Sequence, residues 1–139
     1  MFNAFHHIAL VVPDLDEALE LFSGKMGLRV AKRWSSEEEG NAYAALELAD
    51  GGNFFELICP VDTKKSRFAG HLKKHGPSVH HIAFRSDRMD ELIEQMKTAG
   101  ISGTAPTISS SGWRINFFDS EDTMGIGLQL VDGKHGDGS

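Results

Sequence analysis

The chain has 139 residues, which is enough for one well-buried core and predicts a single compact domain. With 14 basic and 20 acidic residues and no basic run, its composition argues against nucleic acid and against an anionic membrane surface, and favours a small-molecule partner. We find no apolar run of membrane-spanning length, no signal-peptide pattern and only one cysteine, Cys59, so we expect a reduced, cytoplasmic protein.

The first half of the chain predicts a strand, a helix and then three strands. Residues 5–12 are apolar on both faces of a strand, and Pro13-Asp14 then opens a helix that we expect to end at Gly27. The apolar residues of this helix recur at i, i+3, i+4 and i+7, which is one face of an amphipathic helix. The three strands are expected over residues 29–34, 42–49 and 54–59, with a polar loop over 35–41 and a turn over 50–53.

The second half repeats this plan. The stretch Phe5-His6-His7-Ile8-Ala9-Leu10 recurs 74 residues later as Val79-His80-His81-Ile82-Ala83-Phe84. Glu56, in the last strand of the first half, has Gln129 as its counterpart in the second half. The repeated elements are a strand over 79–86, a helix over 88–99, and strands over 102–107, 113–119 and 125–131.

The two halves are joined by a connector over 61–78, which contains a short helix at about 68–75. A glycine-rich polar tail, expected to be mobile, follows from residue 132. We therefore expect two βαβββ modules, at about 5–60 and 79–132, within one α+β domain.

Buried polar residues in the strands point to a metal site. Alternate residues of a strand face the same way, so only one histidine of each repeated pair faces inward. Glu56 is flanked by apolar residues on both sides, and a buried carboxylate there needs a cation or strong donors. A two-residue turn at Gly51-Gly52 would place Glu47 directly across from Glu56. Two facing carboxylates are tolerated if a metal neutralises them or if one stays protonated.

Ordinary structural explanations compete with this hypothesis. A histidine in a strand is more often a hydrogen-bonded core residue than a ligand. His71 and His75 have the i, i+4 spacing of ligands, but beside two lysines they read as a solvated face. Cys59, next to Pro60 at the end of an apolar strand, is expected to be a core residue. Glu37-Glu38-Glu39 is expected to be a solvated loop.

The pattern resembles the vicinal oxygen chelate superfamily, which includes glyoxalase I, extradiol dioxygenases and resistance proteins. Within it, three segments look most like the methylmalonyl-CoA epimerases. They are Arg67-Phe68-Ala69-Gly70-His71-Leu72-Lys73-Lys74, the second copy of the histidine repeat, and Gly112-Trp113-Arg114-Ile115-Asn116-Phe117. The resemblance implies a curved, partly closed mixed sheet of paired βαβββ modules. It also implies a divalent ion between the modules, and mixed nitrogen and oxygen ligands with open sites suit cobalt, nickel, manganese, zinc or iron.

Carried over by position, the resemblance implies metal ligands at His7, Glu56, His81 and Gln129 and a catalytic base at Glu47. These relatives typically have a glutamate where this chain has Gln129, and an amide cannot act as a base near neutral pH. Gln129 therefore cannot supply the second base of a two-base epimerisation. Ser111, in the 109–112 loop, and Arg114, just after it, are the candidates for holding a phosphate or carboxylate of the substrate.

Three functions follow from these residues. The leading hypothesis is a metal-dependent epimerase or isomerase that removes a proton α to a carbonyl, with an acyl-CoA as a possible substrate. An alternative is a ligand-sequestering, resistance-type protein, and a weaker one is an extradiol-type dioxygenase with Glu56 as the carboxylate ligand of iron. Self-association, as a homodimer, is also expected, since open sheets leave edges and apolar surface.

Overall fold

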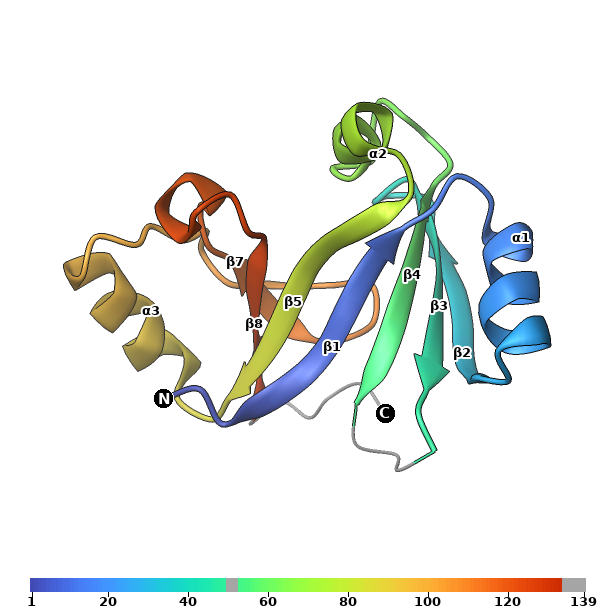
Figure 1. The fold of residues 1–139 in the computed structure, drawn as a ribbon. Helices are drawn as coiled ribbons and strands as arrows, with labels where there is room; N and C mark the ends of the chain where they lie inside the picture. Colours follow the sequence, from blue (N-terminus) through green and yellow to red (C-terminus); the bar gives the residue numbers. More distant parts are fainter. Residues whose placement is uncertain (50–52, 134–139) are drawn as a thin grey trace. The chain divides into compact units, whose positions relative to one another are not determined.

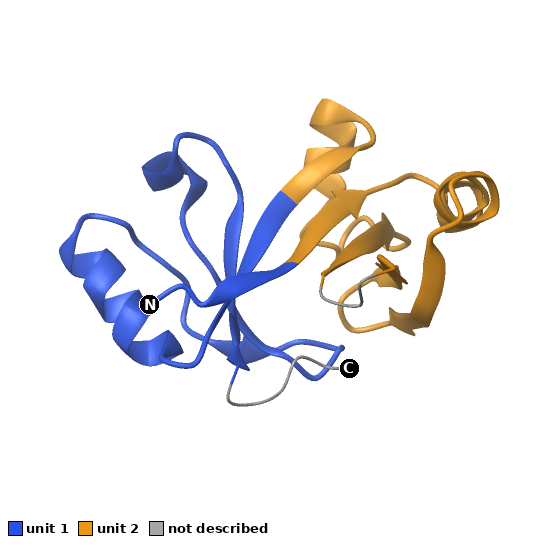
Figure 2. Cartoon of the chain, turned by 60° about the horizontal axis from the view of Figure 1, so that its bottom comes forward, with its two compact units in different colours: residues 1–6, 81–139 blue, residues 7–80 orange. Residues whose placement is uncertain are grey.

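The computed structural model describes residues 1–49 and 53–133 and divides into two compact units. Unit 2 consists of residues 7–80, and unit 1 of residues 1–6 and 81–139 (Figure 2). Because each unit has its own strands and its own helix, each is described by itself below.

Unit 2 contains most of the first repeat and the connector. Its elements are β1 (Ala4–Val11, whose first three residues belong to unit 1), α1 (Leu15–Leu19), η1 (Glu20–Lys25), β2 (Arg29–Ser36), β3 (Asn41–Glu47), β4 (Phe54–Pro60) and α2 (Ala69–His75) (Figure 1). The strand order is β2-β3-β4-β1, with β1 parallel to β4 and the other pairs antiparallel. This gives a mixed four-stranded set of the predicted type.

The continuous helix formed by α1 and η1 covers one face of these strands. The Asp14 side chain accepts a hydrogen bond from the backbone N–H of Glu17 and so caps the first turn. The helix continues as the π-helical η1 and ends before Gly27, whose φ of +81° is the left-handed conformation that favours glycine. Its apolar stripe packs on side chains from β1, β3 and β4, including the fully buried Leu46 and Leu57.

Unit 1 repeats the arrangement. Its elements are β5 (Ser78–Ser86, mostly in this unit), α3 (Met89–Thr98), β6 (Thr107–Ile108), β7 (Arg114–Phe117), the 3-10 helix η2 (Ser120–Thr123) and β8 (Leu128–Asp132). The strand order is β5-β8-β7-β6, and β5 runs parallel to β8 as β1 does to β4. Met89 and Leu92 of α3 pack against Phe118 and Leu130.

The predicted elements are confirmed within a few residues, except for the strand over 102–107. Only Thr107 and Ile108 form the ladder of β6, and the preceding segment meets its neighbours through a single bridge between Gly103 and Phe118. Thr104 makes two further hydrogen bonds to the backbone of Phe117, one of them through its side chain. Pro106 lacks an N–H, so a regular ladder could not run through it.

Two expectations fall on parts of the chain without a description. The turn at 50–53 includes residues 50–52, and the tail includes residues 134–139, and both of these ranges lie outside the described residues. Within residues 1–49 and 53–133, none of the helices has the length and apolar character that a membrane crossing requires.

Candidate metal centre

Each unit presents one histidine and one oxygen-bearing side chain on the same face of its strands. In unit 2, Ala9 of β1 pairs with Glu56 of β4, and His7 lies two residues before Ala9 on the same face. In unit 1, Ala83 of β5 pairs with Gln129 of β8, and His81 stands in the same relation to Ala83. The sequence repeat is thus also a repeat of strand register.

The half-site of unit 2 is a buried histidine–carboxylate pair. His7 is 1% exposed and Glu56 is 6% exposed, and their potential ligand atoms lie within 4.8 Å of each other. The His7 ring stacks on the ring of Phe54, with 5.2 Å between the centroids. Burial, with a smaller contribution from the charge of Glu39, raises the pKa of Glu56 from 4.5 to about 8. A bound cation would reverse this shift, because it would stabilise the ionised carboxylate.

The half-site of unit 1 contains a buried amide in place of the carboxylate. His81 is 1% exposed and contacts the ring of Phe117 edge-on, at 5.0 Å between centroids. Gln129 is 3% exposed, and among the described residues its side-chain oxygen has no hydrogen-bond partner although it is buried. Buried acceptors are nearly always satisfied, so this oxygen is suited to a ligand or a metal ion.

The first histidine of each repeated pair lies on the opposite face of its strand. His6 packs edge-on against Trp113 at 4.7 Å, and His80 packs edge-on against Phe68 at the same distance. His6 is also buried. Burial is the main reason why the pKa of His80 falls from 6.5 to about 4.

The predicted position of Glu47 directly across from Glu56 is wrong. Glu47 pairs with Phe54, and Ala45 is the residue that pairs with Glu56. The hairpin loop is longer than the two residues assumed, because the backbone N–H of Leu48 already bonds to the carbonyl of Asn53. The shift is two residues, so Glu47 keeps the same face as Glu56 but lies diagonal to it, and it forms an ion pair with Arg29.

The interpretation of all three loop glutamates as solvated is also wrong for one of them. Glu37 and Glu38 are exposed, but Glu39 is partly buried and accepts a 2.7 Å hydrogen bond from the hydroxyl of Tyr43. Tyr43 lies on the same face of β3 as Ala45. Sequence reasoning missed both Tyr43 and Glu39, and the signal was Tyr43 itself, the only tyrosine of the chain, within an apolar strand.

Of the two predicted substrate-binding residues, Arg114 lies away from the His81 and Gln129 face. Arg114 pairs with Asp90 of α3 at 2.8 Å and with Asp132 at 3.1 Å, so its guanidinium lies on the α3 side of β7. Ser111 is partly buried and hydrogen-bonded to Ser109 within their loop. A substrate role for either residue stays a prediction.

The competing structural explanations hold for Cys59 and in part for the helix histidines. Cys59 is buried against the α1 side of the strands, and burial raises the pKa of its thiol. His75 is exposed, whereas His71 is partly buried, bonds through Nε2 to the Ser78 hydroxyl at 3.0 Å and contacts the ring of His80.

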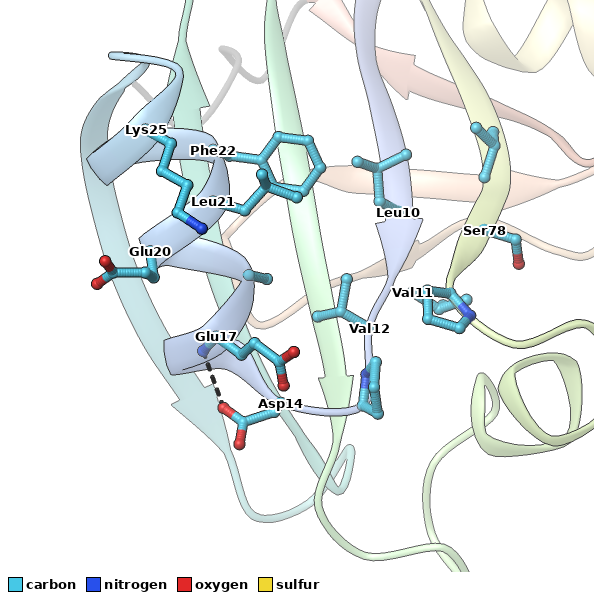
Figure 3. Close-up of a pocket in the computed structure, with 14 residues that line it drawn as sticks. Leu10, Val11, Val12, Asp14, Glu17, Glu20, Leu21, Phe22, Lys25 and Ser78 are labelled. Atoms are coloured by element: carbon cyan, nitrogen blue, oxygen red, sulfur yellow. Dashed lines mark hydrogen bonds between the residues drawn. The ribbon is translucent and has the colours of Figure 1, made fainter.

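A cavity of about 560 Å³ lies on the helix side of unit 2 rather than on the Glu56 face (Figure 3). It is lined by Leu10 of β1, by Val12 just after that strand, and by Leu21 and Phe22 of η1. Its rim carries the capping carboxylate of Asp14, and neither His7 nor Glu56 lines it. This cavity is therefore not the metal face.

The sequence matches the model of the Glyoxalase/Bleomycin resistance protein/Dioxygenase superfamily over residues 6–117. The chain belongs to this superfamily. The predicted resemblance is therefore confirmed, and the matched range includes His7, Glu56 and His81 and stops before Gln129.

Relatives within this superfamily include epimerases. Human mitochondrial methylmalonyl-CoA epimerase is 26% identical over 128 residues, which are 90% of this chain and 71% of that protein. The ethylmalonyl-CoA/methylmalonyl-CoA epimerase of Cereibacter sphaeroides is 25% identical over 134 residues, which are 94% and 98% of the two chains.

A solved structure extends the similarity to the fold. Streptomyces coelicolor methylmalonyl-CoA epimerase, in complex with 2-nitronate-propionyl-CoA, has a TM-score of 0.84 and 29% identity, over 95% of this chain and 98% of that one. The predicted glyoxalase-like α+β fold is thereby confirmed.

Proposed function

We propose that the protein is a metal-dependent epimerase in which His7, Glu56, His81 and Gln129 hold one divalent ion. The observation that carries this proposal is the repeated register, which gives each unit one buried imidazole and one buried side-chain oxygen. A single pair offers only two ligands, and a stably bound ion of this type needs three or four. Two equivalent pairs supply that number.

The donor set fits a transition metal. Two imidazoles and two oxygens suit zinc, cobalt, nickel, manganese or iron, and leave positions open for a substrate. A metal site without its cation is expected to have a carboxylate with a raised pKa and a ligand oxygen without a partner. Glu56 has the first property and Gln129 has the second. When bound, the ion would polarise a carbonyl oxygen of the substrate and so make the neighbouring C–H bond more acidic.

Within unit 2, Glu47 is the proposed base for the α-proton. It lies on the Glu56 face at the end of β3, is partly exposed and forms an ion pair with Arg29. Gln129 can offer its carbonyl oxygen as a ligand but cannot move a proton. The proposed substrate class is an acyl-CoA thioester, since the relatives named above are epimerases of methylmalonyl-CoA.

Two measurements test this function. The first is elemental analysis of His7→Ala and His81→Ala proteins, which should each lose the ion, with the exposed His75→Ala as the matched control. The second is solvent deuterium uptake at the α-carbon of methylmalonyl-CoA, which should be present in the native protein and abolished in Glu47→Gln. Unchanged metal content in both histidine variants would refute the site, and a native protein that binds metal but exchanges no proton would favour a ligand-sequestering protein.

Self-association and a cytoplasmic location complete the proposal. Exposed apolar side chains such as Leu21, Met26 and Val30 are candidates for a homodimer contact. Light scattering at high concentration should give a mass of two chains.

A further inference from the structure

Inversion at a carbon needs a proton to leave on one side and another to arrive on the opposite side. Glu47 is one proposed proton-transfer group, and Gln129 cannot be the other because an amide has no useful basicity. A second group must come from elsewhere if the proposed epimerase function is right, and this inference rests on that function.

Strand β3 carries two side chains that can transfer a proton, one on either side of the position opposite Glu56. Ala45 pairs directly with Glu56, and its side chain is only a methyl group. Glu47 lies two residues after Ala45 and Tyr43 two residues before it, so all three share one face of the strand. A substrate held in front of Ala45 would have a carboxylate toward one end and a phenol toward the other.

The phenol of Tyr43 is held in place by its neighbours. Its ring stacks on Trp34, with centroids 5.0 Å apart and planes at 13°. Its hydroxyl accepts a 3.0 Å hydrogen bond from Nδ2 of Asn41 and donates a 2.7 Å bond to Oε1 of Glu39. The Ser66 hydroxyl in turn donates to Oδ1 of Asn41, which fixes the amide from the connector.

The backbone around Glu39 explains how an acidic residue reaches this position. Gly40 has φ +73°, and a Cβ there would lie 2.8 Å from Cβ of Lys65, so only glycine lets the loop approach the connector so closely. The N–H of Glu39 bonds to the Ser36 hydroxyl at 3.0 Å. The carboxylate is thus directed at Tyr43 while its own residue stays partly in contact with solvent.

We propose that Tyr43 is the second proton-transfer residue of the active site and that Glu39 is the positioning residue that connects it to solvent. In one direction, the α C–H bond breaks and its proton passes to the Glu47 carboxylate, while the electron pair moves to the carbonyl oxygen. The Tyr43 O–H bond then breaks, the electron pair returns from the carbonyl oxygen to the carbon, and the Tyr43 proton forms the new C–H bond on the opposite side. Water restores both groups, taking the proton from Glu47 and returning one to the Tyr43 oxygen by way of Glu39.

The phenol–carboxylate bond has a spectroscopic signature that does not depend on catalysis. Burial raises the pKa of Tyr43, and the bond to Glu39 raises it further. Because the chain has only one tyrosine, the phenolate absorbance can be assigned to Tyr43 without ambiguity. Glu39→Gln should lower this pKa, whereas Glu38→Gln, which changes the exposed neighbour, should leave it unchanged.

The kinetic test separates proton removal from inversion. Tyr43→Phe keeps the ring on Trp34 and removes only the hydroxyl, so solvent deuterium uptake through Glu47 should continue. Loss of optical activity should fall by about 10²- to 10⁴-fold, the contribution of a positioned acid or base. Glu39→Gln should slow inversion less and shift its pH profile, and Glu38→Gln should match the native protein. Thermal unfolding of each variant checks that it is folded.

The outcomes distinguish this inference from the proposed function. If Tyr43→Phe inverts the substrate at the native rate, or loses uptake and inversion in equal measure, Tyr43 is not the second group although the protein is an epimerase. If the native protein takes up deuterium without inversion, it has one base and the inference is wrong. If the native protein exchanges nothing, the proposed function fails and this inference fails with it.

Discussion

Replacing Glu56 by glutamine should stabilise the metal-free protein at alkaline pH. The pKa of Glu56 is 4.5 in an unfolded chain and about 8 in the fold, mainly because burial penalises the charged carboxylate. Between these values the folded protein keeps a proton that the unfolded chain has released. Its free energy of unfolding therefore falls as the pH rises, whereas a glutamine in the same place has no proton to lose.

The change of the unfolding free energy with pH follows from thermodynamic linkage. One proton released on unfolding costs about 1.4 kcal/mol of stability per pH unit, so the whole shift corresponds to roughly 5 kcal/mol. His80 acts in the opposite direction below its unfolded pKa of 6.5. Both proteins share this titration, and from pH 6.5 to 8 the native protein should lose about 2 kcal/mol relative to Glu56→Gln.

The assay is urea unfolding of both proteins after treatment with a chelator, at several pH values from 5 to 8.5. The difference between the two unfolding free energies removes the titrations that they share. Added zinc or cobalt should restore the stability of the native protein at pH 8 and should do so less in the variant. If the unfolding free energies of the two proteins change in parallel from pH 6.5 to 8, Glu56 is ionised in the metal-free fold, and the reasoning about its burial is refuted.

Three further results are expected. Because the pKa of His80 is lowered to about 4, the native protein should lose stability relative to His80→Gln as the pH falls from 6.5 toward 4, and the difference between their urea midpoints measures this loss. Leu57→Ala, in the fully buried core beneath α1, should cost about 2–5 kcal/mol in urea unfolding, whereas the exposed Val61→Ala should change stability by less than about 0.5 kcal/mol. Gly40→Ala should destabilise more than Gly27→Ala in thermal unfolding, since both have positive φ but only the added Cβ at Gly40 meets other atoms; equal effects would contradict the close approach to the connector.

The sequence by itself determined the architecture and the half-sites. The period of two in the strands and the i, i+3, i+4, i+7 spacing in the helices are local properties, so they predict elements without knowledge of the rest of the fold. The repeat of two histidines and of Glu56 with Gln129 then predicted that equivalent strands would carry equivalent polar side chains. The matching registers of Ala9 with Glu56 and Ala83 with Gln129 bear this out.

Only the tertiary structure decided which other polar residues accompany Glu56. The hairpin register placed Ala45, rather than Glu47, opposite Glu56, because it depends on the length of a loop and not on the strand pattern. The burial of Glu39 depends on Gly40 meeting a connector more than twenty residues away in sequence, and two carboxylates from other elements hold Arg114 on the α3 side of β7. These positions result from contacts between distant segments, for which a single sequence carries no local signal.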